Sequence, residues 1–231
     1  MKVLELFAGI GGLSLGLQRA GMRIVGHVEI NPFCRAVLHK HWPEVPAHDD
    51  VHTAATWWRS QPRPHVDIVA GGYPCQPDSL AGPKLGHDDP RWLWPQMADV
   101  IADLQPAWVI GENVLGHRTR GLPTVLAELQ RLGYTPHTGV IRACEMGAPH
   151  PRSRVFVLAH TNGKGRPPRC RLEPAGPPPV RARRWPTEPR VGRVAHGLPG
   201  RVDRVTALGN AVVPAVGEHI GRIVIDHHTT G

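Results

Sequence analysis

The sequence of 231 residues lacks the features that mark several common protein classes. Its cysteines form no CxxC pair, so neither a disulfide framework nor a zinc ribbon is indicated. Its histidines form no HExxH arrangement, and we therefore expect no bound metal. No apolar run approaches the roughly 18 residues that a membrane-spanning helix needs, which argues against a membrane role.

The amino-terminal segment MKVLELFAGIGG enters a strand at its third residue and has no basic region followed by a cleavage site, so we expect a cytoplasmic protein. The net charge of +8 favours a polyanionic partner. Most of this charge lies in residues 163–190, which carry seven Arg and one Lys against two Glu. The basic character is therefore concentrated in one segment.

Short apolar runs alternate with amphipathic segments along most of the chain. This alternation predicts an α/β fold with a doubly wound, mostly parallel sheet. The expected strands are 3–7, 24–28, 66–70 and 107–111, and the expected helices are 13–20, a segment starting at Asn31-Pro32, 92–104, 122–132 and 216–225. Residues 140–143 and 155–160 follow without a long helix between them and predict a closing antiparallel hairpin.

The segment 163–190 interrupts this pattern. It contains eight prolines and three glycines without apolar periodicity, which is typical of a loop or an extended arm. We therefore expect a catalytic domain over 1–160, an Arg/Pro-rich arm over 161–200 and a segment over 201–231 that completes the catalytic domain.

A glycine-rich turn, FAGIGG, directly follows the first expected strand. Glycines allow the backbone to turn sharply there and to approach a nucleotide-type ligand closely. The missing last glycine of GxGxxG disfavours a dinucleotide site and hence a nucleotide-dependent oxidoreductase. Glu29 lies 20 residues after Gly9 at the end of the second strand, where a carboxylate can hold both hydroxyls of a ribose.

A second group of candidates lies at later strand ends. Cys75, flanked by two prolines, follows a central strand at the edge where open parallel sheets bind ligands, which suits a rigidly aimed nucleophile. Glu112 ends the next strand, so its carboxyl group would emerge beside the thiol and assist it as an acid. Arg152 and Arg154 begin a later strand, and at least one of them could face this site.

Five ordered motifs, FAGIGG, PCQ, ENV, RxR and GNAVVP, resemble those of the DNA (cytosine-5) methyltransferase family over roughly residues 1–160 and 200–225. The resemblance implies a Rossmann-like methyltransferase fold, S-adenosyl-L-methionine as cofactor and double-stranded DNA as substrate. The cofactor-binding residues that it implies are Phe7, Gly9, Ile10, Gly11, Gly12, Glu29, Ile30, Asp50, Val51, Gly72, Pro74, Asn210, Ala211 and Val212.

The same resemblance implies a catalytic set. Cys75 would add to carbon 6 of a flipped-out cytosine and so activate carbon 5 toward the methyl group. Glu112 would hydrogen-bond the ring at N3 and the exocyclic amine. Arg154, together with Arg152, would hold the base or its phosphate.

Three features depart from the family pattern. Asp78 stands in place of an aromatic residue, His150 in place of glutamine, and a short arm in place of a target-recognition domain. We expect the arm to make mostly phosphate contacts, which gives short or relaxed sequence recognition unless a partner chain supplies specificity. A monomer is the default expectation. Methylation of RNA, such as transfer RNA, and a catalytically inactive DNA-binding homologue are the alternative functions, and a role in restriction-modification is left open.

Overall fold

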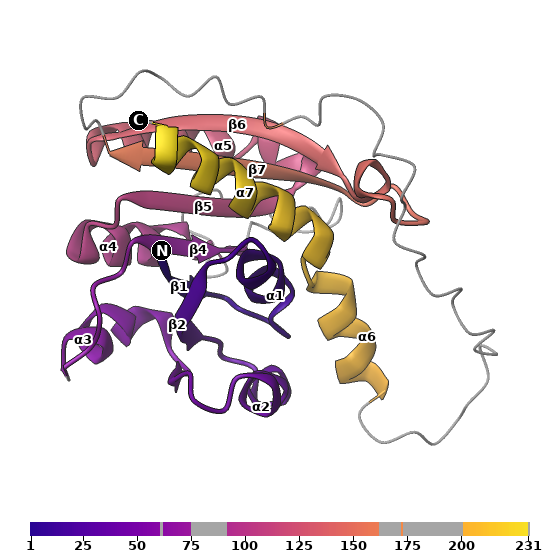
Figure 1. Ribbon diagram of the computed structural model, residues 1–231, viewed down its shortest axis with the longest axis horizontal. Helices are drawn as coiled ribbons and strands as arrows, with labels where there is room; N and C mark the ends of the chain where they lie inside the picture. Colours follow the sequence, from indigo (N-terminus) through magenta and orange to yellow (C-terminus); the bar gives the residue numbers. More distant parts are fainter. Residues whose placement is uncertain (61, 75–91, 162–171, 173–200, 231) are drawn as a thin grey trace.

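A seven-stranded sheet forms the centre of the protein (Figure 1). The structure, a computed structural model, describes residues 1–60, 62–74, 92–161, 172 and 201–230. The strand order is β3-β2-β1-β4-β5-β7-β6. The strands are β1 (Lys2–Leu6), β2 (Arg23–Val28), β3 (Ala47–His48), β4 (Ile68–Gly71), β5 (Trp108–Val114), β6 (Tyr134–Arg142) and β7 (Ser153–Thr161).

The first five strands of this order are parallel to one another, and the last three pair antiparallel. This arrangement confirms the predicted mostly parallel sheet with a closing antiparallel hairpin. The central strands β1 and β4 are almost wholly buried because helices cover both faces of the sheet. The apolar runs of the sequence therefore correspond to strands at the middle of the sheet.

The helices form two layers, each with its own apolar core. The helices are α1 (Gly12–Arg19), α2 (Pro32–His41), α3 (Ala54–Arg59), α4 (Trp94–Leu104), α5 (Leu122–Arg131), α6 (Arg201–Asn210) and α7 (Pro214–Thr230). Side chains of α3, α4 and α5 pack on one face of the sheet, and those of α1 and α7 pack on the other. None of these helices, over the residues described, is long and apolar enough to cross a membrane.

The last helix returns to the beginning of the chain. α7 packs along α1, although about 200 residues separate them in sequence. Glycines allow this close contact, because a side chain at Gly16 would meet the backbone of Pro214 and Glu218, and one at Gly221 would meet Ala20. The carboxyl-terminal segment thus completes the layer that the first helix begins.

Several elements differ from the sequence-based expectation. β3 and α3, of two and six residues, were not expected because they are too short to show an apolar period. α6 was not expected, because its sequence RVDRVTALGN has no clear apolar stripe. β6 begins at Tyr134 rather than at residue 140, because this strand lies at the edge of the sheet, where Pro136 and polar side chains are tolerated. The expected arm over 161–200 lies outside the described residues except for Thr161 and Leu172.

Candidate active site

The glycine-rich turn joins β1 to α1 at the carboxyl end of the sheet. Phe7, Gly9 and Gly11 all have positive φ angles, of 54°, 54° and 80°, so the chain reverses within a few residues. Gly12 lies so close to the Val212 carbonyl that any side chain there would clash with it. The turn therefore requires glycine at Gly12 because another backbone segment covers it.

Glu29 at the end of β2 holds the glycine-rich turn in place. Its Oε2 accepts a hydrogen bond from the Gly9 backbone N–H at 2.7 Å, and its Oε1 accepts one from the Asn31 N–H at 2.8 Å. The side chain is only 9% exposed. Each carboxylate oxygen has a second lone pair, so both can still accept a hydrogen bond from a ligand hydroxyl.

Three further predicted cofactor residues follow β2 and β3. Ile30 is 78% exposed directly after Glu29. Asp50 caps the 3₁₀ helix η1 (Val51–Thr53) by accepting a hydrogen bond from the His52 backbone N–H at 2.9 Å, and the pKa of Asp50 is lowered mainly by this bond. Val51 is buried.

Gly72 and Pro74 follow β4, next to β5. A side chain at Gly72 would lie 2.8 Å from Glu112 Oε2, so glycine lets the two strand ends approach. The Asn113 side-chain amide donates to the Tyr73 carbonyl at 2.9 Å. Pro74 is exposed. The predicted nucleophile Cys75 lies outside the described residues, as does Asp78, which departs from the family pattern.

Glu112 and Arg154 form an ion pair between β5 and β7. Arg154 Nε lies 2.8 Å from Glu112 Oε1, and both side chains are largely buried. Burial raises the pKa of Glu112 to about 7, and the positive charges of Arg154 and Arg152 oppose this rise. A carboxyl group with such a pKa exists in both protonation states near neutral pH, which is a property of general acids.

Arg152 takes different partners from Arg154. Its Nη2 donates hydrogen bonds to the carbonyls of Gly209 and Ala211, both at 2.7 Å. These carbonyls belong to the junction between α6 and α7, which contains the predicted residues Asn210, Ala211 and Val212. Asn210 is exposed at the end of α6, whereas Ala211 and Val212 are half-buried.

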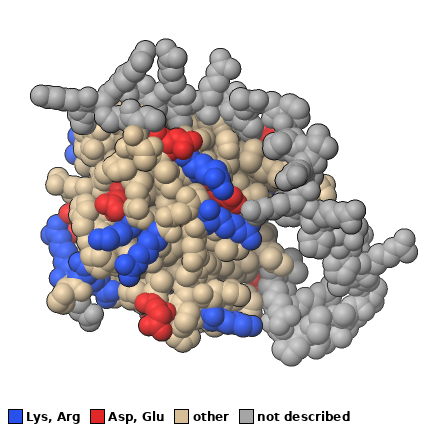
Figure 2. Space-filling view, in the orientation of Figure 1, with Lys and Arg blue, Asp and Glu red and all other residues tan. Residues whose placement is uncertain are grey.

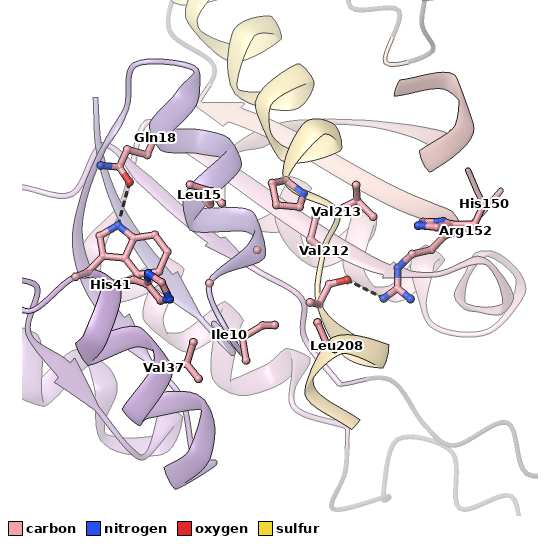
Figure 3. Close-up of a pocket in the computed structure, with 15 residues that line it drawn as sticks. Ile10, Leu15, Gln18, Val37, His41, His150, Arg152, Leu208, Val212 and Val213 are labelled. Atoms are coloured by element: carbon pink, nitrogen blue, oxygen red, sulfur yellow. Dashed lines mark hydrogen bonds between the residues drawn. The ribbon is translucent and has the colours of Figure 1, made fainter. Parts of the chain in front are cut away.

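A cavity of about 690 Å³ lies between α1, α2 and this junction (Figure 3). It gathers six of the predicted residues: Ile10, Gly11, Gly12, Arg152, Ala211 and Val212. The other described candidates do not line it. Asn210 ends α6, and Arg154 lies near the start of β7. The remaining candidates lie at or just after the ends of β3, β2, β1, β4 and β5, which are neighbours in the sheet. The predicted residues thus share one edge of the sheet, with the cavity at the side of α1.

Sequence reasoning missed two groups that support this edge. Tyr73 Oη lies 2.9 Å from His117 Nε2, which ties the end of β4 to the 3₁₀ helix η3 (Leu115–Thr119) after β5. Beneath the glycine-rich turn, the Ser14 hydroxyl donates to Glu5, and it lies 2.9 Å from His27 Nε2. In the sequence, the only indication of the Tyr73–His117 contact was a tyrosine directly before Pro74 and Cys75.

Charge is mixed on the one face of the protein that Figure 2 presents, over the residues described. Figure 2 shows Lys and Arg side chains interspersed with Asp and Glu side chains on the face that it presents. The basic segment 163–190, which sequence analysis linked to a polyanionic partner, lies outside the described residues except for Leu172. Among the described residues, no cluster of three His, Cys, Asp or Glu side chains is arranged to hold a metal ion.

Comparison with known families gives one match over most of the chain. The model of the C-5 cytosine-specific DNA methylase family matches residues 1–196. Among curated proteins, Type II methyltransferase M2.BsuMI of Bacillus subtilis is 35% identical over 168 residues, which are 69% of this chain and 42% of that protein. Type II methyltransferase M.Eco47II of Escherichia coli is 37% identical over 168 residues, which are 69% of this chain and 39% of that protein.

Solved structures show the same fold. A putative DNA modification methyltransferase encoded within an Escherichia coli prophage matches with a TM-score of 0.58 at 25% identity. The match covers 70% of this chain and 47% of the prophage-encoded chain. Dnmt2 methyltransferase of S. pombe matches with a TM-score of 0.57 at 26% identity, over 72% of this chain and 52% of the Dnmt2 chain. The chain spans less than half the length of the curated relatives named above.

Proposed function

The chain belongs to the C-5 cytosine-specific DNA methylase family, and on this premise we propose that it transfers a methyl group from S-adenosyl-L-methionine to carbon 5 of cytosine in double-stranded DNA. The order of side chains along the sheet edge carries this proposal. Groups suited to a nucleoside, Asp50, Glu29 and Gly9, follow β3, β2 and β1, and the Glu112–Arg154 pair lies on β5 and β7. Cofactor and base would therefore lie side by side across β4.

The residues at the cofactor end of this edge fit S-adenosyl-L-methionine. Glu29 is buried and has acceptor capacity left on both oxygens for the two ribose hydroxyls. The exposed Ile30 follows β2 and offers an apolar surface for the adenine. Asp50 and Val51 follow the neighbouring strand β3. Phe7, Gly9, Ile10, Gly11, Gly12, Gly72, Pro74 and the junction 210–212 would form the rest of the pocket. The bound cofactor supplies an electrophilic methyl group on a positively charged sulfur.

Glu112 and Arg154 suit the target base. With a pKa of about 7, Glu112 can be protonated at neutral pH and donate a hydrogen bond to N3 of cytosine. Arg154, whose Nε lies 2.8 Å from Glu112 Oε1, holds this carboxyl group in place and has further N–H groups that can bind the oxygen of the base.

Cys75 would supply the nucleophile. Its thiolate adds to carbon 6, which forms a C–S bond and shifts the electrons of the 5,6 double bond to carbon 5, while Glu112 stabilises the charge on the ring. Carbon 5 then takes the methyl group. Removal of the carbon 5 proton by a base restores the double bond and expels the thiolate. Because a cytosine stacked in duplex DNA is out of reach of these groups, it must first be flipped out.

We further propose short or relaxed sequence recognition by a monomer, with a partner chain as an alternative source of specificity. The residues between Thr161 and α6 number fewer than 40, which is too few for an independent recognition domain. The basic segment 163–190 would contact phosphates, which position DNA without reading its sequence. A cytoplasmic location, in a bacterium or a virus-infected host, is part of the same proposal.

The first test is transfer of a labelled methyl group from S-adenosyl-L-methionine to mixed-sequence duplex DNA, followed by bisulfite sequencing. We expect methylcytosine in a short or loose sequence context. We expect Cys75→Ser to lose at least about 10³-fold of the rate, because carbon 5 is not activated without the adduct. Cys144→Ser is the matched control, since Cys144 is an exposed free cysteine that is not among the proposed catalytic or cofactor-binding residues.

Two results would contradict this proposal. Transfer to structured RNA but not to DNA would favour the RNA alternative. Binding of the cofactor without transfer to either nucleic acid would favour an inactive homologue or a requirement for a partner chain.

A further inference from the structure

Arg152 has an unusual backbone conformation directly before β7. Its φ is 25°, in a region that residues other than glycine rarely adopt. Residues two apart on a regular strand point to the same face, so Arg152 would otherwise share a face with Arg154. The positive φ breaks this register. Arg154 therefore pairs with Glu112, whereas Arg152 reaches the α6–α7 junction.

The contacts of Arg152 match the chemistry of a helix end. The last carbonyls of a helix have no partner within the helix and carry partial negative charge, so a cation there is stabilising. Arg152 Nη2 donates to the carbonyls of Gly209 and Ala211 at 2.7 Å, and the two hydrogens of this nitrogen are thereby both used. Figure 3 shows the guanidinium reaching the junction beside Val212 and Leu208.

The junction in turn covers the glycine-rich turn. The Val212 carbonyl lies against Gly12, one residue after the carbonyl of Ala211 that Arg152 holds. Ile10, Gly12, Ala211 and Arg152 also line the same cavity. Arg152 thus connects the edge that carries Glu112 with the backbone that closes over the first turn of α1.

We propose that Arg152 is a positioning residue for the cofactor, which fastens the 209–212 junction over the glycine-rich turn, and that it does not hold the target base or its phosphate. This inference rests on the proposed function. It assigns the two arginines of the RxR motif to different ligands: Arg154 acts on the base side with Glu112, and Arg152 acts on the cofactor side through backbone carbonyls.

The test compares Arg152→Ala, Arg152→Lys and the control Arg222→Ala. Arg222 is an exposed arginine of α7 that pairs with Glu218, so it reports the loss of an arginine from the same part of the fold. The dissociation constant of S-adenosyl-L-methionine is measured by calorimetry without DNA. We expect it to rise about tenfold or more in Arg152→Ala, as for loss of hydrogen bonds to a charged group. We expect a smaller rise in Arg152→Lys, which can restore one bond, and no change in Arg222→Ala.

DNA binding separates this role from a phosphate or base contact. At saturating cofactor, we expect the KM for DNA and its salt dependence to stay within about twofold of the wild type in Arg152→Ala, because no phosphate contact is removed. An unchanged cofactor constant together with a raised KM for DNA and a reduced salt dependence would overturn the inference.

Hydrogen exchange tests the contact itself without any ligand. In Arg152→Ala, amides of the α6–α7 junction should exchange faster, while those of β1 and β4 keep their protection, which also shows that the variant is folded. Equal exchange at the junction in both proteins would overturn the inference. Failure of the wild type to bind the cofactor would overturn the proposed function as well, whereas tight binding by wild type and Arg152→Ala alike would overturn the inference alone.

Discussion

In the proposed reaction, Glu112 is the residue whose environment most directly affects the chemistry. It is 7% exposed, and burial raises its pKa to about 7 against the opposing charges of Arg154 and Arg152. Below this pH the carboxyl group is protonated and can donate a hydrogen bond to N3, and above it the carboxyl group ionises and this donor is lost. We therefore expect kcat/KM for DNA to fall as pH rises through about 7.

The measurement is the pH profile of kcat/KM for the wild type and Glu112→Gln. The amide has no proton to lose, so the variant should lack the falling limb and be slower by roughly 10²–10⁴-fold, the usual contribution of acid catalysis. Its affinity for the cofactor should be unchanged and serves as the control. A falling limb with the same midpoint in the variant would show that another group titrates.

Three buried side chains beneath the glycine-rich turn, Glu5, Ser14 and His27, show why the partners of a single residue are hard to predict from sequence. Burial raises the pKa of Glu5 to about 8 and lowers that of His27 to about 4, so both side chains are neutral at pH 7. Their hydrogen bonds to Ser14 satisfy them in the core. In the sequence, Glu5 is an ordinary charged residue within a strand. Its partners lie 9 and 22 residues away and meet it only after β1, β2 and α1 pack together.

At the scale of elements, the contact between α1 and α7 leaves no room for a side chain at Gly16. A methyl group at Gly16 would lie 2.5 Å from the Pro214 carbonyl oxygen and 2.7 Å from the Glu218 backbone nitrogen. Backbone atoms cannot move aside as a flexible side chain can, so Gly16→Ala must push α7 away. We expect a loss of about 1–3 kcal/mol in the free energy of unfolding, the usual cost of overpacking.

Urea unfolding of Gly16→Ala measures this loss. Gly209→Ala is the matched control, because an added methyl group there meets nothing within 4 Å. It should be neutral or slightly stabilising, since alanine favours a helix more than glycine does. Equal stability of Gly16→Ala and the wild type would mean that α7 does not pack on α1 as closely as the structure indicates.

Most elements were predictable because their apolar spacing matches a helix or a buried strand. The expected helix 122–132 and strand 107–111, for example, correspond to α5 and β5 within a few residues. α6 was missed because it is largely polar, and among its described side chains only Ala207 is buried. The first half of β6, YTPHT, was missed because it contains Pro136 and polar residues without apolar alternation, and its residues after Tyr134 are only partly buried.

For the whole molecule, the convergence of the candidate residues followed from topology. Parallel strands carry their carboxyl ends to one edge, so residues that end successive strands must lie there together. The sequence therefore predicted the neighbourhood of Gly9, Glu29 and Glu112. It could not predict the partners of Arg152, because these depend on where the chain returns about 57 residues later.

The central claim is that this chain attacks cytosine through Cys75 at the edge that holds Glu112 and Arg154. Duplex DNA containing 5-fluorocytosine tests it most directly, because a fluorine at carbon 5 cannot leave as a proton does, so the adduct formed after methyl transfer persists. We would incubate this DNA with the chain and S-adenosyl-L-methionine, then analyse the products by denaturing electrophoresis and peptide mass spectrometry.

The account predicts a cofactor-dependent protein–DNA product linked through Cys75. Cys144→Ser should form this product and Cys75→Ser should not. A chain that binds S-adenosyl-L-methionine but forms no covalent product with the DNA, or a product linked through another residue, would contradict it.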